Sequence, residues 1–435
     1  MLEKYKLKMK VFKYPEISEW QSLCERAQIE RNELEDIVNG ILDNVKENGD
    51  TALVEYAQKF DGVVLDSLEV SKEEIEGASQ TVSEDLKQAI QLAKKNIEVF
   101  HASQKNNETI VETTKGVQCW RKSLPIEKVG LYIPGGSAPL FSTILMLGVP
   151  AKLAGCKEIV LCTPPNKQGS VHPAILYTAN LVGVTKIFKV GGAQAIGAMT
   201  FGTETIPETY KIFGPGNQFV TKAKELIQQQ GVAIDMPAGP SEVLVIADKT
   251  CNPSFVAADL LSQAEHGADS QAILVSTSEE VIEEVNKEIL KQLLELPRKD
   301  IAEKALENSR AILVKDAKEA VAFSNTYAPE HLIIASENSE SYIENITNAG
   351  SVFLGNYSCE SAGDYASGTN HTLPTYGFAK NYSGVSLDSF VKKVTFQKLS
   401  KEGIKNIGNA IELMAEAEGL DAHKNAVSLR LESLK

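Results

Sequence analysis

The chain has 435 residues, of which 43% are hydrophobic and 23% are charged, and its formal net charge is −14. This composition is typical of a soluble globular protein, with length for roughly two to four domains, and it excludes a disordered, fibrous or membrane-spanning chain. The acidic balance argues against nucleic acid or an anionic membrane as the main partner, because both attract basic surfaces.

The cysteines and the N-terminus indicate a reducing compartment. None of the six cysteines forms a CxxC pair, so we expect reduced thiols rather than disulfides or a cysteine-rich metal site. No uncharged apolar run approaches the roughly 18 residues of a membrane helix. The basic N-terminus lacks the apolar segment of a signal peptide. The sequence therefore predicts a cytoplasmic protein.

The first hundred residues are charged and predict mostly helix. Near the N-terminus, lysines alternate with Leu7, Met9 and Val11, which is the period-2 pattern of a short half-buried strand. From Glu19 to about Val99, apolar residues recur three or four apart and glycine is scarce. This spacing predicts exposed amphipathic helices, with short strands possible around Val63–Val70.

From about Lys128, short β-branched runs alternate with helical stretches. Strands are expected at Val129–Ile133, Glu158–Cys162, Lys186–Val190, Lys211–Phe213, Val232–Asp235, Glu242–Ile246 and Ala272–Ser276. Helices are expected at Ser142–Ala154, His172–Leu181, Ala193–Thr200, Gln218–Gln230 and Pro253–Glu265. Alternating units of this length predict a mostly parallel, doubly wound α/β sheet.

The same alternation continues towards the C-terminus. Helices are expected at Glu279–Leu294 and Asp316–Thr326, and strands at Ala311–Val314 and near Leu332 and Val352. The segment Asn356–Tyr382 is rich in Gly, Ser, Asn, Tyr and His, and we expect a long functional loop. From Lys401 the tail is expected to be helical up to Glu418, with Gly419 as the stop.

Two clusters of polar residues indicate chemistry in the second half of the chain. Gln263 and His266 lie three residues apart at the end of an expected helix, so both can face one point and bind a divalent metal such as zinc. An ordinary polar helix end would show the same spacing. Glu330 and His331 follow Pro329 in an expected turn, and they form a carboxylate–imidazole pair suited to acid/base catalysis. A surface Glu-His pair is the alternative.

Further candidates come from the long loop and the tail. Asp364 and His371 could supply an oxygen ligand and a second imidazole, unless the loop is merely solvated. Glu418 and His423 gain a role only if the tail folds back or reaches a partner subunit. No cysteine joins these residues, so such a site is expected to handle substrate rather than to stabilise the fold. Manganese could occupy the same donors.

Glycine-rich turns follow several of the expected strands. They occur at Gly135-Gly136, Gly191-Gly192, Gly214-Pro215-Gly216 and Ala238-Gly239-Pro240. Backbone N–H groups at such helix starts can hold a pyrophosphate, although any one of these segments is more often only a tight turn. The third glycine of a GxGxxG fingerprint is missing after Gly216, and no P-loop is present. Residue patterns alone therefore predict a soluble α/β enzyme with a metal site and an anionic cofactor.

Taken together, these segments resemble the histidinol dehydrogenase family. The matching segments are Gly130-Leu-Tyr-Ile-Pro-Gly-Gly136, Gly191-Gly-Ala-Gln-Ala-Ile-Gly197, Phe213-Gly-Pro-Gly-Asn217, Asp235-Met-Pro-Ala-Gly-Pro-Ser-Glu242, Leu261-Ser-Gln-Ala-Glu-His-Gly267, Ala328-Pro-Glu-His-Leu332, Ser361-Ala-Gly-Asp-Tyr-Ala-Ser-Gly-Thr-Asn-His371 and Glu418-Gly-Leu-x-Ala-His423. They occur in the family's order over most of the chain, and the set is far more specific than any one segment.

The resemblance implies oxidation of L-histidinol through L-histidinaldehyde to L-histidine, with two NAD molecules reduced and one zinc ion per subunit. By similarity, the zinc ligands are Gln263, His266, Asp364 and His423, and these four also contact the substrate. The catalytic pair is Glu330, which activates water, and His331, the general base; both touch substrate. Further substrate contacts are Ser241, His371 and Glu418, and the NAD contacts are Tyr132, Gln194 and Asn217.

The resemblance also implies a fold and an assembly. It implies two Rossmann-like doubly wound domains without a GxGxxG fingerprint, an N-terminal segment and a small helical C-terminal tail domain. The expected boundaries are 1–27 for the N-terminal segment, 28–131 plus 241–385 for the first domain, 132–240 for the second and 386–435 for the tail. The family forms an intertwined homodimer in which the tail completes the partner's site.

Two other functions stay open from the sequence. One is a zinc- and NAD-dependent dehydrogenase of the same fold that acts on another small polyol or sulfonate. The presence of His371, Glu418 and His423 favours histidinol over these substrates. The other is a zinc hydrolase that uses Glu330 as its base and needs no nicotinamide.

Overall fold

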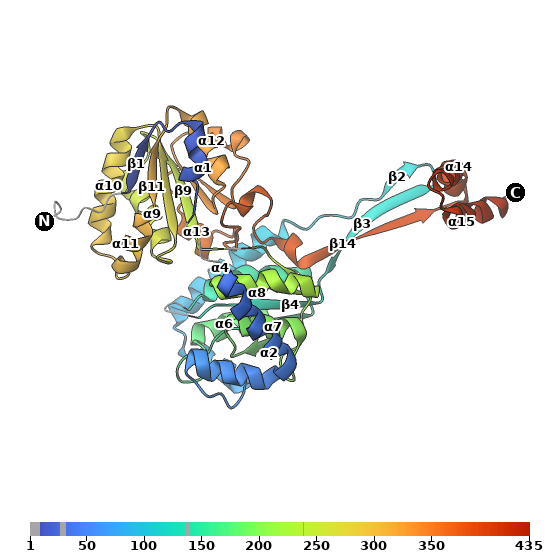
Figure 1. Ribbon diagram of the computed structural model, residues 1–435, viewed down its shortest axis with the longest axis horizontal. Helices are drawn as coiled ribbons and strands as arrows, with labels where there is room; N and C mark the ends of the chain where they lie inside the picture. The colour runs from blue at the N-terminus through green and yellow to red at the C-terminus, as the bar shows by residue number, and fades with distance from the viewer. Residues whose placement is uncertain (1–8, 27–31, 136–138, 238) are drawn as a thin grey trace.

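The computed structural model describes residues 9–26, 32–135, 139–237 and 239–435, and it has three parts (Figure 1). Two of them are α/β lobes, each built on one parallel sheet, and the third is an arm that projects away from both lobes. Among the described residues, no helix is long and apolar enough to cross a membrane. All six cysteines are free, as expected.

The first lobe contains a six-stranded sheet in the order β1-β11-β10-β9-β12-β13, with every pair parallel. Its strands are β1 (Lys10–Lys13), β9 (Glu242–Ala247), β10 (Gln271–Ser276), β11 (Arg310–Leu313), β12 (His331–Ala335) and β13 (Ser351–Leu354). Its helices are α1 (Trp20–Leu23), α9 (Pro253–Ala264), α10 (Glu279–Leu293), α11 (Lys299–Glu307), α12 (Ala317–Tyr327) and α13 (Glu360–Tyr365). Helices on both faces explain why β9 and β10 are buried along their whole length.

The second lobe contains a five-stranded parallel sheet in the order β6-β5-β4-β7-β8. Its strands are β4 (Lys128–Tyr132), β5 (Glu158–Cys162), β6 (Lys186–Phe188), β7 (Lys211–Phe213) and β8 (Ala233–Ile234). Its helices are α2 (Asn32–Tyr56), α3 (Lys72–Thr81), α4 (Glu84–Ala102), α5 (Phe141–Ala154), α6 (Pro173–Val182), α7 (Gly192–Phe201) and α8 (Gln218–Ile227). Two apolar clusters, one on each face, hold these helices to the sheet.

The arm is an antiparallel sheet followed by a pair of helices. Its strands run in the order β14-β3-β2, with β2 (Val111–Thr114), β3 (Val117–Pro125) and β14 (Val391–Leu399). The helices α14 (Lys401–Ala417) and α15 (Asp421–Glu432) pack on each other at its far end (Figure 1). Phe390, at the root of the arm, is fully buried and stacks on Phe213 of the second lobe.

Short helical turns complete the chain. They are η2 (Ile17–Glu19), η3 (Ala57–Asp61), η4 (Gln228–Gln230), η5 (Ser339–Asn345), η6 (Phe378–Lys380) and η7 (Leu387–Phe390).

Both sheets reverse their strand order at one point, and ligands of doubly wound sheets bind at such points. The reversal lies at β9, between β10 and β12, in the first lobe and at β4, between β5 and β7, in the second. Glu242 and His331 are the first residues of β9 and β12, whereas Tyr132 and Phe213 are the last residues of β4 and β7. The site in the first lobe is therefore at the amino ends of its strands, not at the carboxyl ends where such sheets usually bind ligands.

The structure differs from the sequence predictions in several places. No strand forms within Val63–Val70, where a single bridge joins Glu69 to Phe188. The expected loop at Asn356–Tyr382 begins with helix α13. Helices α11 and α15 and the three strands of the arm were not predicted. The predicted strand at the N-terminus is confirmed as β1, although Leu7 lies outside the described residues.

The division into domains stays a prediction, but sheet membership does not follow the expected boundaries. Residues 28–131 were expected with the first domain. Instead, β4 pairs with β5 and β7, and α2 packs against α7 and α8, all in the second lobe. Conversely, β1 pairs with β11, so the N-terminal segment contributes a strand to the first lobe.

Candidate active site

A cleft of about 710 Å³ lies between the two lobes. The second lobe contributes Asn217 and Lys222 to its lining, and the first lobe contributes Ser241, His266 and Tyr376. The cleft therefore joins the strand-order reversals of the two sheets, and it brings Ser241, His266 and Asn217 of the sequence prediction to one place.

Glu330 and His331 are held at the start of β12 by the neighbouring strand. Ala328 has a positive φ of 54°, which turns the chain before Pro329 and directs it into β12. The backbone N–H of Glu242 donates to Oε2 of Glu330 at 2.9 Å. The carbonyl oxygen of Glu242 lies 3.4 Å from Nδ1 of His331. Both side chains are almost fully buried, with exposed fractions of 6% and 4%.

Two more carboxylates approach His331 from helix α13. Oε1 of Glu360 lies 3.8 Å and Oε2 of Glu330 lies 3.7 Å from Nδ1 of His331. Oδ1 of Asp364 lies 3.6 Å from Nε2, just beyond hydrogen-bonding range. Glu360 and Asp364 share one face of α13 because they are four residues apart. The imidazole is therefore surrounded by three carboxylates.

Burial and these charges shift the pKa values of the whole cluster. Burial alone would lower the pKa of His331, but Glu360, Glu330 and Asp364 outweigh it and raise that pKa to about 10. Burial raises the pKa of Glu330 and of Glu360 to about 8. Burial opposes ionisation of Asp364 too, yet the adjacent His331 holds its pKa below the usual range. The pKa of His331 therefore lies above that of a free imidazole because of its three carboxylate neighbours.

A group of ligand atoms suited to a metal ion lies beside this pair. His266, Glu360 and Asp364 each place one ligand atom within 4.8 Å of the others. Gln263 is fully buried in α9, and neither its amide oxygen nor its amide nitrogen has a hydrogen-bond partner. A buried amide without partners is costly, so these two atoms fit a position at which a ligand binds. Nitrogen and oxygen donors of this kind suit zinc.

Glu360 was not predicted from the sequence. The segment that carries the family resemblance begins at Ser361, one residue too late to include it. The only local signal is the four-residue spacing of Glu360 and Asp364, which indicates a shared face only if the segment is helical. Because the segment was expected to be a loop, that signal was lost.

His371 is held through both of its ring nitrogens. Nδ1 lies 2.9 Å from the carbonyl oxygen of Asp364, and Nε2 lies 3.1 Å from Oγ1 of Thr143 on α5. Burial lowers the pKa of His371. Thr143, which was not predicted, thus ties this histidine to the second lobe.

Two of the predicted NAD contacts, Gln194 and Asn217, lie at helix starts of the second lobe, and the third, Tyr132, ends β4. Asn217 caps α8, where its side-chain oxygen accepts from the N–H groups of Phe219 and Val220. Tyr132 accepts a hydrogen bond from the N–H of Gly192 at the start of α7, and burial raises its pKa to about 12. Gln194 is on the same helix and is almost fully buried. Asn217 lines the cleft, whereas Tyr132 and Gln194 are not among its described lining residues.

Glu418 and His423 are not brought to this site within the chain. Glu418 caps the end of α14, and His423 is in the first turn of α15. Both residues are exposed, and Figure 1 places α14 and α15 at the far end of the arm, away from α9 and α13. One chain therefore gathers three of the four predicted zinc ligands.

Comparison with known proteins identifies this arrangement. The family model described as histidinol dehydrogenase matches residues 24–431. A histidinol dehydrogenase of Bacteroides thetaiotaomicron is 61% identical over 427 residues, which cover 98% of this chain and 100% of that protein. One from Mannheimia succiniciproducens is 56% identical over 95% of this chain and 96% of its own length. The crystal structure of histidinol dehydrogenase from Elizabethkingia anophelis superposes with a TM-score of 0.97, at 62% identity and 99% coverage of both chains.

Proposed function

The chain belongs to the histidinol dehydrogenase family of NAD-dependent oxidoreductases, which catalyse the last step of histidine biosynthesis, and we propose that it oxidises L-histidinol in two steps through L-histidinaldehyde to L-histidine. The observation that carries this proposal is the buried Glu330–His331 pair beside a group of metal-ligand atoms. Of this metal-ligand group, His266 also lines the cleft between the two lobes.

The residues present fit a zinc ion. Gln263, His266 and Asp364 would hold it, with Glu360 within reach of the same point. A zinc ion there would supply positive charge that offsets the carboxylates around His331 and would act as a Lewis acid towards nitrogen donors of the substrate. Manganese suits the same donors.

His331 is the general base of the first step. It must be neutral to accept the hydroxyl proton of histidinol as hydride leaves the carbinol carbon. The surrounding carboxylates raise the pKa of His331, so a cation held by them would favour the neutral imidazole that this step needs. NAD is the hydride acceptor in both steps.

Glu330 activates water in the second step. Its pKa of about 8 lies close to neutral pH, which suits a group that both takes and releases a proton. Water adds to the aldehyde as Glu330 takes its proton, and His331 then assists the second loss of hydride. No cysteine takes part in the described site, so the aldehyde needs no thiohemiacetal intermediate.

The nucleotide is expected to bind to the second lobe without a GxGxxG fingerprint. When its strands are numbered in chain order, the sheet of the second lobe reads 3-2-1-4-5, which supports a Rossmann-like domain. The sheet of the first lobe has the same order from β11 to β13, with β1 added at the β11 edge. Gln194 and Asn217 lie at the helix starts that follow β6 and β7, and the hydroxyl of Tyr132, the last residue of β4, contacts the N–H of Gly192. Backbone N–H groups at such positions suit a pyrophosphate.

The arm supports a homodimer whose sites are shared between subunits. Leu413 and Met414 on α14 are 59% and 66% exposed, and Leu420 and Leu429 are also exposed. We propose that a second copy covers these residues, and that Glu418 and His423 of one subunit complete the substrate and zinc site of the other. The free cysteines support a cytoplasmic location.

One assay separates this function from its two rivals. Zinc-loaded protein is supplied with NAD and histidinol, and the absorbance of NADH is followed. NADH formation with histidinol but not with small polyols or sulfonates supports the proposal. Turnover of a polyol or sulfonate alone supports the related dehydrogenase, and cleavage of a substrate without NAD supports the zinc hydrolase. Protein treated with a chelator is the control.

A further inference from the structure

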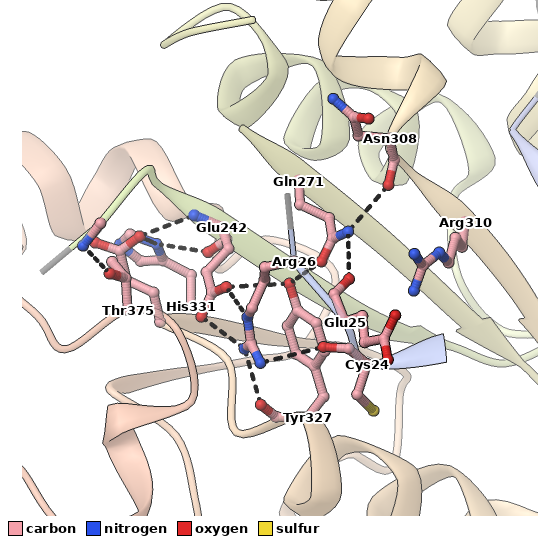
Figure 2. Close-up of polar contacts among 12 residues, drawn as sticks. Cys24, Glu25, Arg26, Glu242, Gln271, Asn308, Arg310, Tyr327, His331 and Thr375 are labelled. Carbon is pink, nitrogen blue, oxygen red and sulfur yellow. Dashed lines mark hydrogen bonds and ion pairs between the residues drawn. The ribbon is translucent and has the colours of Figure 1, made fainter. Parts of the chain in front are cut away.

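A buried arginine is linked to the catalytic pair through Glu242. Arg26 follows α1 in the N-terminal segment, and its side chain is 13% exposed. Figure 2 shows its guanidinium between Glu242 and Tyr327. Nε donates to Oε2 of Glu242 at 2.7 Å, and a second nitrogen donates to Oε1 at 2.9 Å. The guanidinium carbon also lies 3.9 Å from the centre of the Tyr327 ring.

Glu242 connects this arginine to the catalytic residues. Its side chain is bound by Arg26 and by the hydroxyl of Tyr327, which donates to it at 3.2 Å. Its backbone N–H donates to the Glu330 carboxylate at 2.9 Å, and its carbonyl faces His331. A single residue therefore has its side chain fixed by Arg26 and its main chain bonded to the water-activating carboxylate.

Arg26 also fixes the other end of the Glu330 segment. The nitrogen that donates to Oε1 of Glu242 also donates to the carbonyl oxygen of Tyr327, at 2.9 Å. The next residue is Ala328, whose positive φ directs the chain towards Glu330. A non-glycine residue keeps such a conformation only when its surroundings hold it. Arg26 thus clamps the two segments that meet at Glu330, the start of β9 and the turn before β12.

We propose that Arg26 is a positioning residue for Glu330, and that it acts through the main chain of Glu242 and the carbonyl of Tyr327. The inference rests on the proposed role of Glu330 in the second oxidation. Lysine cannot replace this clamp, because only the planar fork of a guanidinium can bind both oxygens of Glu242 and a carbonyl at once. Stability alone does not explain a buried ion pair between Arg26 and Glu242, because apolar residues at such positions often stabilise a protein equally well.

The test compares Arg26→Lys and Arg26→Met with a matched control, Arg310→Met. Arg310 also binds the N-terminal segment, where it donates to the carbonyl oxygens of Ser22 and Leu23. It makes no described contact with Glu242 or Tyr327, and Figure 2 shows it apart from the clamp. Arg26→Lys keeps the positive charge beside Glu242, so it decides the test if Arg26→Met does not fold. For each variant, the first hydride transfer from histidinol is followed in a single turnover, and the oxidation of supplied histidinaldehyde is followed at steady state.

If Arg26 positions Glu330, Arg26→Lys lowers kcat for histidinaldehyde by about 10- to 100-fold more than it lowers the rate of the first hydride transfer from histidinol, because a displacement of about 1 Å has effects of this size. KM for histidinaldehyde changes little, and Arg310→Met shows no difference between the substrates. Equal losses for both substrates, or the same pattern in Arg310→Met, would mean that Arg26 only stabilises the fold.

A crystal structure of Arg26→Lys separates this inference from the proposed function. Loss of the hydrogen bond between Glu242 and Glu330 supports the positioning role even if the wild-type protein does not oxidise histidinaldehyde, in which case the proposed function alone fails. A carboxylate that stays 2.9 Å from the N–H of Glu242 overturns the inference, whatever the activity.

Discussion

Two inactive variants are expected to restore activity when their subunits are mixed. His331→Asn removes the proposed base from the lobe, and His423→Asn removes the proposed zinc ligand from the arm. His423 is exposed on α15, at the far end of the arm from the site in the same chain (Figure 1). If the arm completes the partner's site, each mixed dimer has one site with both defects and one site with neither.

The size of the recovery follows from this arrangement. Random exchange of equal amounts makes about half of the dimers mixed, and one of the two sites in each mixed dimer is intact, so about one quarter of wild-type activity returns. The assay is NADH formation after the two variants are unfolded and refolded together. Glu330→Gln mixed with His331→Asn is the control, because both changes lie in the same half of the site and no activity returns. A mixture of His331→Asn and His423→Asn that stays inactive would refute the shared site.

Three further predictions follow from particular contacts. Glu330→Gln should slow the oxidation of supplied histidinaldehyde by roughly 100- to 10,000-fold, the usual contribution of a general base, and should slow the first hydride transfer from histidinol, measured in a single turnover, much less. Lys224 forms an ion pair with buried Asp235, and Asp235 accepts a hydrogen bond from the N–H of Gly214, three residues before Asn217. Lys224→Met leaves the Asp235 carboxylate unpaired, so it should lower the free energy of unfolding in urea by about 3–5 kcal/mol. It should also raise KM for NAD more than KM for histidinol. Burial raises the pKa of Asp259 from 3.8 to about 7. Because the folded chain keeps this proton longer than the unfolded chain, the free energy of unfolding should fall by up to about 4 kcal/mol as pH rises from about 4 to 7. Asp259→Asn should abolish that fall in urea titrations with chelator present; an unchanged pH dependence would contradict the assignment.

The parallel sheets were predictable because their strands are buried on both faces. Continuous apolar runs such as Glu242–Ala247 and Gln271–Ser276 strongly favour buried strands when helical segments separate them. Capping residues such as Asn217 and Asn252 marked the helix starts equally well.

The arm could not be predicted in the same way. Strands β3 and β14 pair along nine residues each, but they lie far apart in the sequence and carry many exposed charged side chains. Their stability comes from contact with each other, and no local pattern records such a partner. The points at which the strand order reverses could not be predicted from local patterns either, because strand order depends on pairing between residues far apart in the sequence.

Much of the site was predictable from the family segments, but Glu360 and the electrostatics of the site were not. The family segments indicated Gln263, His266, Glu330, His331 and Asp364, and the structure brings all five together. The pKa of His331 depends on Glu360 and Asp364, which approach it only because α13 packs beside β12. Arg26 reaches the same site from the other end of the chain, through Glu242.

The most direct test of the proposed function is the number of NADH molecules formed for each histidinol consumed by the zinc-loaded protein. A ratio of about two is expected if one site takes the alcohol to the carboxylate, because each oxidation transfers one hydride. A ratio of about one would show that the aldehyde is released, and it would contradict water activation by Glu330.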